Sequence, residues 1–97
     1  MRTIEWTTQF KRDFKRESKG KYRHVLEDES GSGFFAIVEC LANDELIDMR
    51  YCDHPLSGNW QDHRDCHIKP NLVLIYQKPD QETMRLVRLG SHSELGL

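Results

Sequence analysis

The sequence predicts an α+β fold in which helices cover one face of an antiparallel sheet. Helix-like patterns of apolar residues occupy the first half of the chain. In the second half, the uninterrupted apolar run at 72–76 is typical of a strand buried on both faces. A short turn joins this run to the next strand, and a connection that short cannot be a parallel crossover. Helices followed by a meander of strands indicate an α+β domain.

The chain is predicted to begin with a strand and then a helix. Residues 2–6 alternate weakly between polar and apolar side chains, as a short strand does. Either of the two following threonines can cap a helix, because its side chain accepts a hydrogen bond from a free backbone N–H. Phe10 and Phe14 stand four residues apart and therefore share one helix face. We expect this helix to end near Gly20.

A second helical region follows, and glycines interrupt it. Apolar residues with helical spacing occur at 22–26 and again at 37–41. Between them, Ser30–Gly33 contains two glycines, and each opposes a continuous helix by about 1 kcal/mol relative to alanine. We therefore expect a break or a kinked pair of helices at this segment.

Strands account for most of the second half of the chain. Residues 63–69 form an extended segment that ends at Pro70, and the buried strand at 72–76 follows. The polar segment 78–81 contains proline and aspartate and predicts a turn. A last strand is predicted at 83–89, closed by a glycine.

Length and composition limit the classes of protein that the chain can represent. Its 97 residues predict a single domain over 1–97. The sequence contains no apolar run near the roughly 20 residues of a membrane span and no apolar N-terminal signal segment, so we expect a cytoplasmic protein without membrane contact. Cys40, Cys52 and Cys66 are odd in number and widely spaced, which predicts free thiols.

Charge is distributed unevenly along the chain. Residues 1–24 hold eight basic and three acidic side chains, whereas residues 25–48 hold seven acidic and no basic ones. The basic block can attract a polyanion, although an ordinary solvated helix face would show the same pattern. The acidic block would repel nucleic acid, so any RNA-binding surface should lie elsewhere.

Residues 53–67 contain three of the five histidines, which points to proton transfer or metal binding. The spacing of these histidines fits no standard zinc pattern, and Arg64 would repel a cation, so we expect no metal. A zinc-binding regulator that uses His54, Cys66 and His67 stays as an alternative. Nucleophilic catalysis by Cys66 is disfavoured, because neighbours on a strand point to opposite faces and no glycine-rich elbow is present.

Metal-independent RNA cleavage fits these residue types best. RNA carries its own nucleophile, the 2′-hydroxyl, so an enzyme has to accept that proton, donate one to the 5′-oxygen and stabilise the crowded phosphate. Histidines at 54, 67 and 92 can transfer the protons, and Arg64 or Arg88 can bind phosphate oxygens. Trp60 or Tyr76 can stack on a base.

Three segments of the chain resemble a known toxin family. Residues 53–60, Asp-His-Pro-Leu-Ser-Gly-Asn-Trp, are similar to the Asp-His-Pro-Leu-x-Gly-x-Trp motif of YafQ-like toxins. The likeness continues through Arg64–Tyr76 and ends in Arg88–Leu95. It is dense over residues 50–97 and only a likeness of pattern over 1–49. YafQ-like toxins belong to the RelE superfamily of bacterial toxin–antitoxin systems.

The resemblance implies a RelE-like fold, a twisted antiparallel sheet with two N-terminal helices on one face. It implies a ribosome-dependent endoribonuclease that cuts mRNA in the A site of the small ribosomal subunit without a cofactor. It also implies a cognate antitoxin, bound in a heterotetramer or larger complex. By this likeness the catalytic residues are His54, His67 and His92, and the RNA contacts are Arg64, Arg88, Trp60, Lys11, Arg12, Lys15 and Arg16.

Two positions depart from the pattern of the family. Asn71 replaces the usual aspartate of the catalytic set, and an amide cannot accept a proton at neutral pH although it can still orient a neighbour. The alternative function is therefore a weakened or inactive module that binds the ribosome or the antitoxin. The family often has an aromatic residue after the position of Leu95, where this chain has Gly96 and Leu97.

Overall fold

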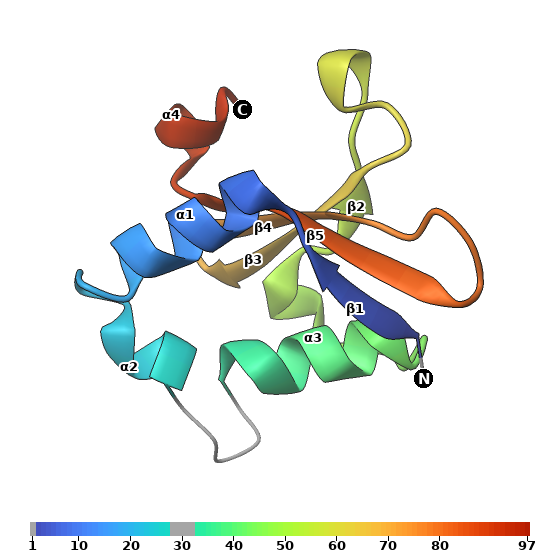
Figure 1. Ribbon diagram of the computed structural model, residues 1–97, viewed down its shortest axis with the longest axis horizontal. Coiled ribbons are helices and arrows are strands. Elements are labelled where there is room, and N and C mark those ends of the chain that lie inside the picture. The colour runs from blue at the N-terminus through green and yellow to red at the C-terminus, as the bar shows by residue number, and fades with distance from the viewer. Residues whose placement is uncertain (1, 28–32) are drawn as a thin grey trace.

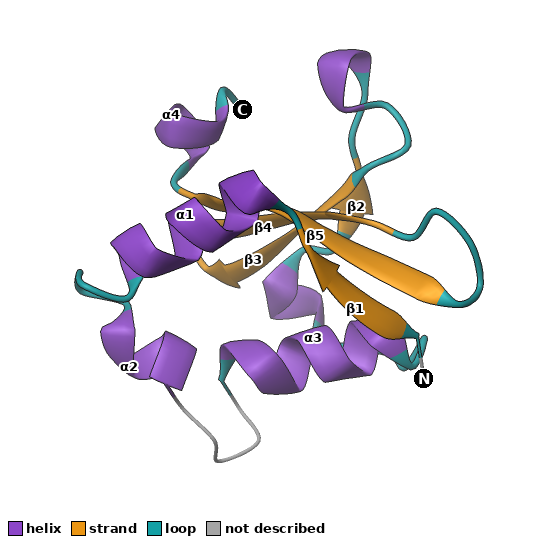
Figure 2. Ribbon diagram, in the orientation of Figure 1, coloured by secondary structure: helices purple, strands orange, loops and turns teal. Residues whose placement is uncertain are grey.

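The computed structural model describes residues 2–27 and 33–97 and shows a five-stranded sheet with helices packed against it (Figure 1). The strands lie in the order β1-β5-β4-β3-β2. Their bounds are β1 Thr3–Trp6, β2 His54–Pro55, β3 Arg64–Lys69, β4 Leu72–Gln77 and β5 Thr83–Gly90. The helices are α1 Thr8–Glu17, α2 Arg23–Glu27, α3 Phe34–Ala42 and α4 His92–Leu95. The predicted α+β class is confirmed, and Figure 2 shows helices and strands in separate layers.

The N-terminal half follows the sequence pattern closely. The Thr7 side chain caps α1 by accepting a hydrogen bond from the backbone N–H of Phe10 at 3.0 Å. Phe10 is fully buried, and its ring stacks on that of Phe34 in α3 with 6.1 Å between ring centroids. The expected break between two helices is confirmed by the end of α2 and the start of α3. Ser30–Ser32 of the predicted break lie outside the described residues.

The sheet separates two apolar clusters, and β4 contributes to both. Leu72, Leu74 and Tyr76 pack into the main core with α1 and α3. Val73 and Ile75 point to the opposite face and pack against Leu95, Leu56 and Trp60. The continuous apolar run therefore serves a strand buried on both faces, as predicted. One face carries the helical core, and the other is left for α4 and the loops around β2.

One edge of the sheet differs from the predicted meander. β1 pairs with β5 in parallel, with Thr3 opposite Thr83, while the other three pairings are antiparallel. A parallel pair needs a long connection, and the whole chain between β1 and β5 provides it. None of the helices in the described residues is long and apolar enough to cross a membrane.

Candidate active site

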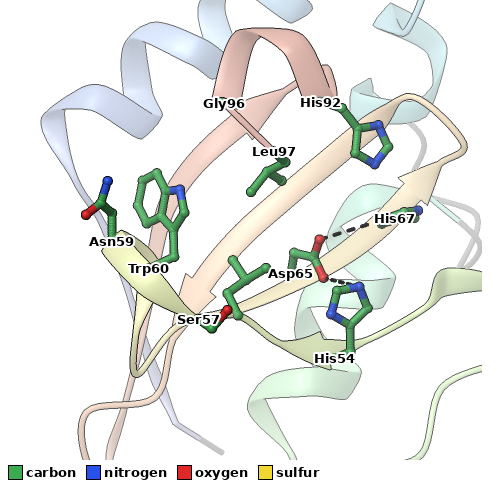
Figure 3. Close-up of a pocket in the computed structure, with 10 residues that line it drawn as sticks. His54, Ser57, Asn59, Trp60, Asp65, His67, His92, Gly96 and Leu97 are labelled. Atoms are coloured by element: carbon green, nitrogen blue, oxygen red, sulfur yellow. Dashed lines mark ion pairs between the residues drawn. The ribbon is translucent and has the colours of Figure 1, made fainter.

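Three histidines from distant parts of the chain meet on the sheet face opposite α3. His54 lies on β2, His67 on β3, and His92 is the first residue of α4. The ring centroids of His54 and His67 are 6.2 Å apart, and those of His67 and His92 are 4.9 Å apart. The imidazoles line one side of an open pocket of about 480 Å³ (Figure 3). The structure therefore brings together the three histidines that the sequence singled out.

Strand pairing explains why two of the rings face each other. His54 on β2 is the register partner of Asp65 on β3, so both side chains project from the same face of the sheet. Asp65 and His67 are two residues apart on one strand and therefore also share that face. The Asp65 carboxylate lies between the two imidazoles, with Oδ1 at 2.9 Å from His54 Nε2 and Oδ2 at 3.6 Å from His67 Nε2.

Asp65 is a functional candidate that the sequence reasoning missed. Its side chain is only 3% exposed, and burial raises the pKa of its carboxyl group while the three nearby histidines oppose that rise. Oδ1 accepts no hydrogen bond from the described residues, despite its short contact with His54. A buried, incompletely bonded carboxylate is costly, which makes the position a candidate for a functional role. The available signal was an aspartate two residues before a histidine on a predicted strand.

Asn71 holds His92 in place. The Asn71 Oδ1 accepts a hydrogen bond from the backbone N–H of His92 at 3.3 Å and lies 3.3 Å from the Nδ1 atom of its ring. Both contacts need an acceptor oxygen at this position, which an amide supplies as well as a carboxylate does. Asn71 therefore supplies the acceptor oxygen that an aspartate would supply here, without the negative charge.

The opposite wall of the pocket is apolar and aromatic. Trp60 stands across the pocket from the imidazoles (Figure 3), and Leu56 and Leu97 also line the pocket. The Trp60 ring is half-buried and packs on the cluster around Val73 and Ile75. Gly96 lines the pocket as well as Leu97, so the residues near the chain end contribute to this wall. Such a wall offers a flat surface to a nucleobase.

The predicted arginines lie outside the set of residues that line the pocket. Arg64 extends toward the loop before β2, where its Nε donates to Asp53 Oδ1 at 3.1 Å. Arg88 is partly buried, and its Nε donates to Asp13 Oδ2 in α1 at 2.7 Å. Phosphate contacts by these two residues stay a prediction that the geometry does not test.

The basic residues of α1 divide into two groups. Lys11, Arg12 and Lys15 are exposed, and no salt bridge engages them in the described part of the chain. The Arg16 guanidinium instead turns toward the end of β5, where its Nη2 donates to the Leu89 carbonyl oxygen at 2.9 Å. The first three remain candidates for an RNA contact, whereas Arg16 is already committed to contacts inside the protein.

Two alternatives from the sequence are wrong. Tyr76 cannot stack on a base, because its ring is 1% exposed and its hydroxyl donates to Asp53 Oδ1 at 2.5 Å. The zinc set with Cys66 does not form, because Cys66 lies in the helical core on the other face from His67. Burial also raises the pKa of the Cys66 thiol to about 12, which agrees with the prediction that it is no nucleophile.

A different set of groups could hold a metal ion. Ligand atoms of His54, Asp65 and His67 lie within 4.8 Å of one another, and two imidazoles with a carboxylate suit a transition metal. The same atoms are those needed for proton transfer, so an ion there would compete with acid–base chemistry.

Comparison with known proteins places the chain and its fold in a class of bacterial toxins that belong to toxin–antitoxin systems. Residues 2–96 match the family model described as the bacterial toxin of type II toxin–antitoxin system, YafQ. The chain belongs to this YafQ family. It is 35% identical to the mRNA interferase toxin YafQ of Escherichia coli K12 over 95 residues, which cover 97% of this chain and 95% of that protein.

Solved structures agree with this assignment. A metal-bound toxin from Helicobacter pylori is 41% identical, with a TM-score of 0.79, and the match covers 98% of this chain and 99% of that one. The Escherichia coli DinJ–YafQ complex contains a chain that is 30% identical, with a TM-score of 0.74 and 98% of both chains covered. The resemblance seen in the sequence is thus confirmed over the whole length of the chain.

Proposed function

We propose that the chain is an endoribonuclease that cleaves mRNA in the ribosomal A site by metal-independent acid–base catalysis. The observation that carries the proposal is the convergence of His54, His67 and His92 around one pocket. The names of the relatives support it, since the Escherichia coli family member is an mRNA interferase toxin. The DinJ–YafQ complex supports a cognate antitoxin as partner, in a heterotetramer or larger assembly that keeps the toxin inactive.

The order of the rings suggests a role for each. The attacking 2′-oxygen and the leaving 5′-oxygen lie on opposite sides of the phosphorus, so the base and the acid must flank it. His54 and His92 each neighbour His67 from different elements, which fits the two flanking positions. Asp65 Oδ1 beside His54 Nε2 would stabilise the imidazolium that forms when His54 takes a proton. We therefore assign His54 as the base, His92 as the acid and His67 to the phosphate oxygens.

The step balances with protein groups alone. His54 accepts the 2′-hydroxyl proton as the 2′-oxygen bonds to phosphorus, and His92 donates a proton as the bond from phosphorus to the 5′-oxygen breaks. The products are a 2′,3′-cyclic phosphate and a 5′-hydroxyl end. Trp60 would stack on a base beside the cleaved bond, and Arg64 and Arg88 would contact flanking phosphates.

Translation-coupled cleavage mapped by primer extension tests the activity. We expect wild-type protein stripped of transition metals to cut ribosome-bound mRNA in a buffer that keeps the Mg²⁺ needed by the ribosome, and His92→Ala to be at least about 10²-fold slower. His24→Gln is the matched control, because His24 is an exposed histidine on α2 far from the pocket. Wild-type protein that binds ribosomes normally yet cuts nothing would instead establish the inactive binding module.

A sulfur-substituted substrate tests the assignment of acid and base. A bridging 5′-sulfur leaves without protonation, so mRNA with this single substitution should restore cleavage by His92→Ala but not by His54→Ala. Rescue of the His54 variant alone would reverse the two roles.

A further inference from the structure

The described residues contain two fully buried carboxylates, Asp65 in the pocket and Asp13 on the inner face of α1. Asp13 is 0% exposed. Its Oδ2 accepts from Arg88 Nε at 2.7 Å and from the backbone N–H of Leu89 at 3.0 Å, and its Oδ1 accepts from Arg16 Nη1 at 3.0 Å. Gln9 adds a contact at 3.3 Å. Burial raises the pKa of Asp13, but these hydrogen bonds outweigh that effect, so its pKa is lowered and the group stays ionised.

The contacts of Asp13 fix the direction of the Arg88 side chain. Arg88 faces the carboxylate with two nitrogens, Nε at 2.7 Å from Oδ2 and Nη2 at 3.4 Å from Oδ1. This forked arrangement holds a planar guanidinium in one orientation. Among the described residues no contact engages the third nitrogen, Nη1, and the side chain is 23% exposed. Arg88 can therefore present one N–H edge to a phosphate while Asp13 holds the other.

The same network continues to α4, which carries His92. Arg16 bonds Asp13, donates to the Leu89 carbonyl and pairs through Nε with Glu94 Oε2 at 3.3 Å. Glu94 in turn accepts from the backbone N–H of Ser91, the residue before His92. A Cβ atom at Gly90 would lie 2.9 Å from Arg16 Nη2, so a larger residue there would push this guanidinium out of its present position.

We propose that Asp13 is a positioning residue for RNA cleavage, which orients Arg88 directly and the start of α4 through Arg16. This inference rests on the proposed nuclease function. The carboxylate is remote from the imidazoles and touches neither substrate nor reacting atoms. Asp13 instead fixes the positions of a phosphate-binding guanidinium and of the proton donor. Groups held in position before the reaction lower the activation barrier, because they need no reorganisation while the reaction proceeds.

The test compares single-turnover cleavage of saturating ribosome-bound mRNA by Asp13→Asn, Arg88→Ala and the double variant. We expect Asp13→Asn to be at least about tenfold slower at saturation, with the half-saturating concentration changed less than about threefold. Because Asp13 acts largely through Arg88, the double variant should be slower by much less than the product of the single effects. Glu5→Gln, which removes a carboxylate from the exposed Glu5–Arg85 pair, is the matched control and should cleave normally.

Asp13→Glu provides a second variant with the charge retained and displaced by one methylene. A folded Asp13→Glu protein should also lose rate at saturation, because orientation rather than charge is altered. Wild-type rates in a folded Asp13 variant, effects that multiply in the double variant, or failure of both Asp13 variants to fold would each overturn the positioning role. If wild-type protein does not cleave at all, the nuclease proposal itself fails, so the two failures are distinguishable.

Discussion

At the scale of single residues, the pocket differs from an ordinary protein surface because it buries a carboxylate between two imidazoles. Asp65 is placed by β3 and matched in register to His54, so the local fold enforces a costly arrangement. Groups of this kind are expected where function outweighs stability.

Replacement of Asp65 by asparagine should separate the effect of this carboxylate on stability from its effect on cleavage. Because burial raises the pKa of Asp65 in the folded protein, its ionisation opposes folding at neutral pH. We expect Asp65→Asn to raise the free energy of unfolding at pH 7 by about 1 kcal/mol and to slow cleavage at least about tenfold. The gain in stability should vanish below about pH 3, where the carboxyl group is protonated in both states. Urea denaturation of both proteins at pH 7 and pH 3 measures these free energies of unfolding. An Asp65→Asn protein less stable than wild type at pH 7 would contradict the prediction.

Asn71 allows a charge to be added beside His92 without a change of shape. Asn71→Asp keeps the oxygen that accepts the His92 backbone N–H and adds a negative charge near the ring, which favours its protonated form. With His92 as the acid, the high-pH limb of the pH–rate profile should move to higher pH, and the rate at pH 8 should rise about threefold or more. A shift confined to the low-pH limb would indicate that His92 is the base.

At the scale of elements, the sequence predicted the parts that have strong local patterns. The α1 cap, the break before α3 and the strands β3, β4 and β5 all follow from capping, glycine and apolar periodicity. β2 is only two residues long and exposed, so it carries no periodic signal. The parallel β1–β5 pairing joins residues about 80 positions apart and depends on long-range packing. The three histidines were found from residue type, whereas the placement of Asp65 required the β2–β3 register.

The short helix α4 had a local signal that the sequence reading left unused. Ser91 and Glu94 form a capping box, in which the Ser91 side chain accepts from the Glu94 N–H and Glu94 accepts from the Ser91 N–H. Serine followed three residues later by glutamate marks a helix start. Since His92 occupies the first turn, this cap helps to set the position of the proposed acid.

Removal of the cap should therefore slow catalysis and leave the protein folded. Ser91→Ala costs roughly 1 kcal/mol of helix stability, and α4 packs on the sheet mainly through Leu95. We expect cleavage to fall by about three- to tenfold while the Tm drops by no more than about 4–8 °C. Ser93→Ala, an exposed serine in the same helix, is the control. Equal rates for the two variants would show that the cap has no part in placing His92.

At the scale of the whole molecule, the sheet separates stability from chemistry. The face covered by α1, α2 and α3 holds the main core, and the opposite face holds the pocket. The basic helix α1 connects the two, because the buried Asp13 contacts Arg88 of β5 and the side chain of Arg16 reaches Glu94 of α4, while Lys11, Arg12 and Lys15 face solvent. Figure 1 shows α1 beside α4, and the ion pair between Arg16 and Glu94 joins the two helices.

Neutralisation of that outer surface should weaken binding without a change in chemistry. Lys11, Arg12 and Lys15 are exposed and do not line the pocket, so their replacement by glutamine removes long-range attraction only. We expect affinity for ribosomes to fall, and the slope of log affinity against log salt concentration to decrease by about 2, while the cleavage rate at saturation stays within about twofold of wild type. A control protein carries glutamine at Arg50, Lys78 and Arg85, which removes the same charge from three positions outside α1. If both triple variants lose affinity equally, net charge rather than the exposed face of α1 controls binding, and a loss of rate at saturation would place α1 in the chemical step.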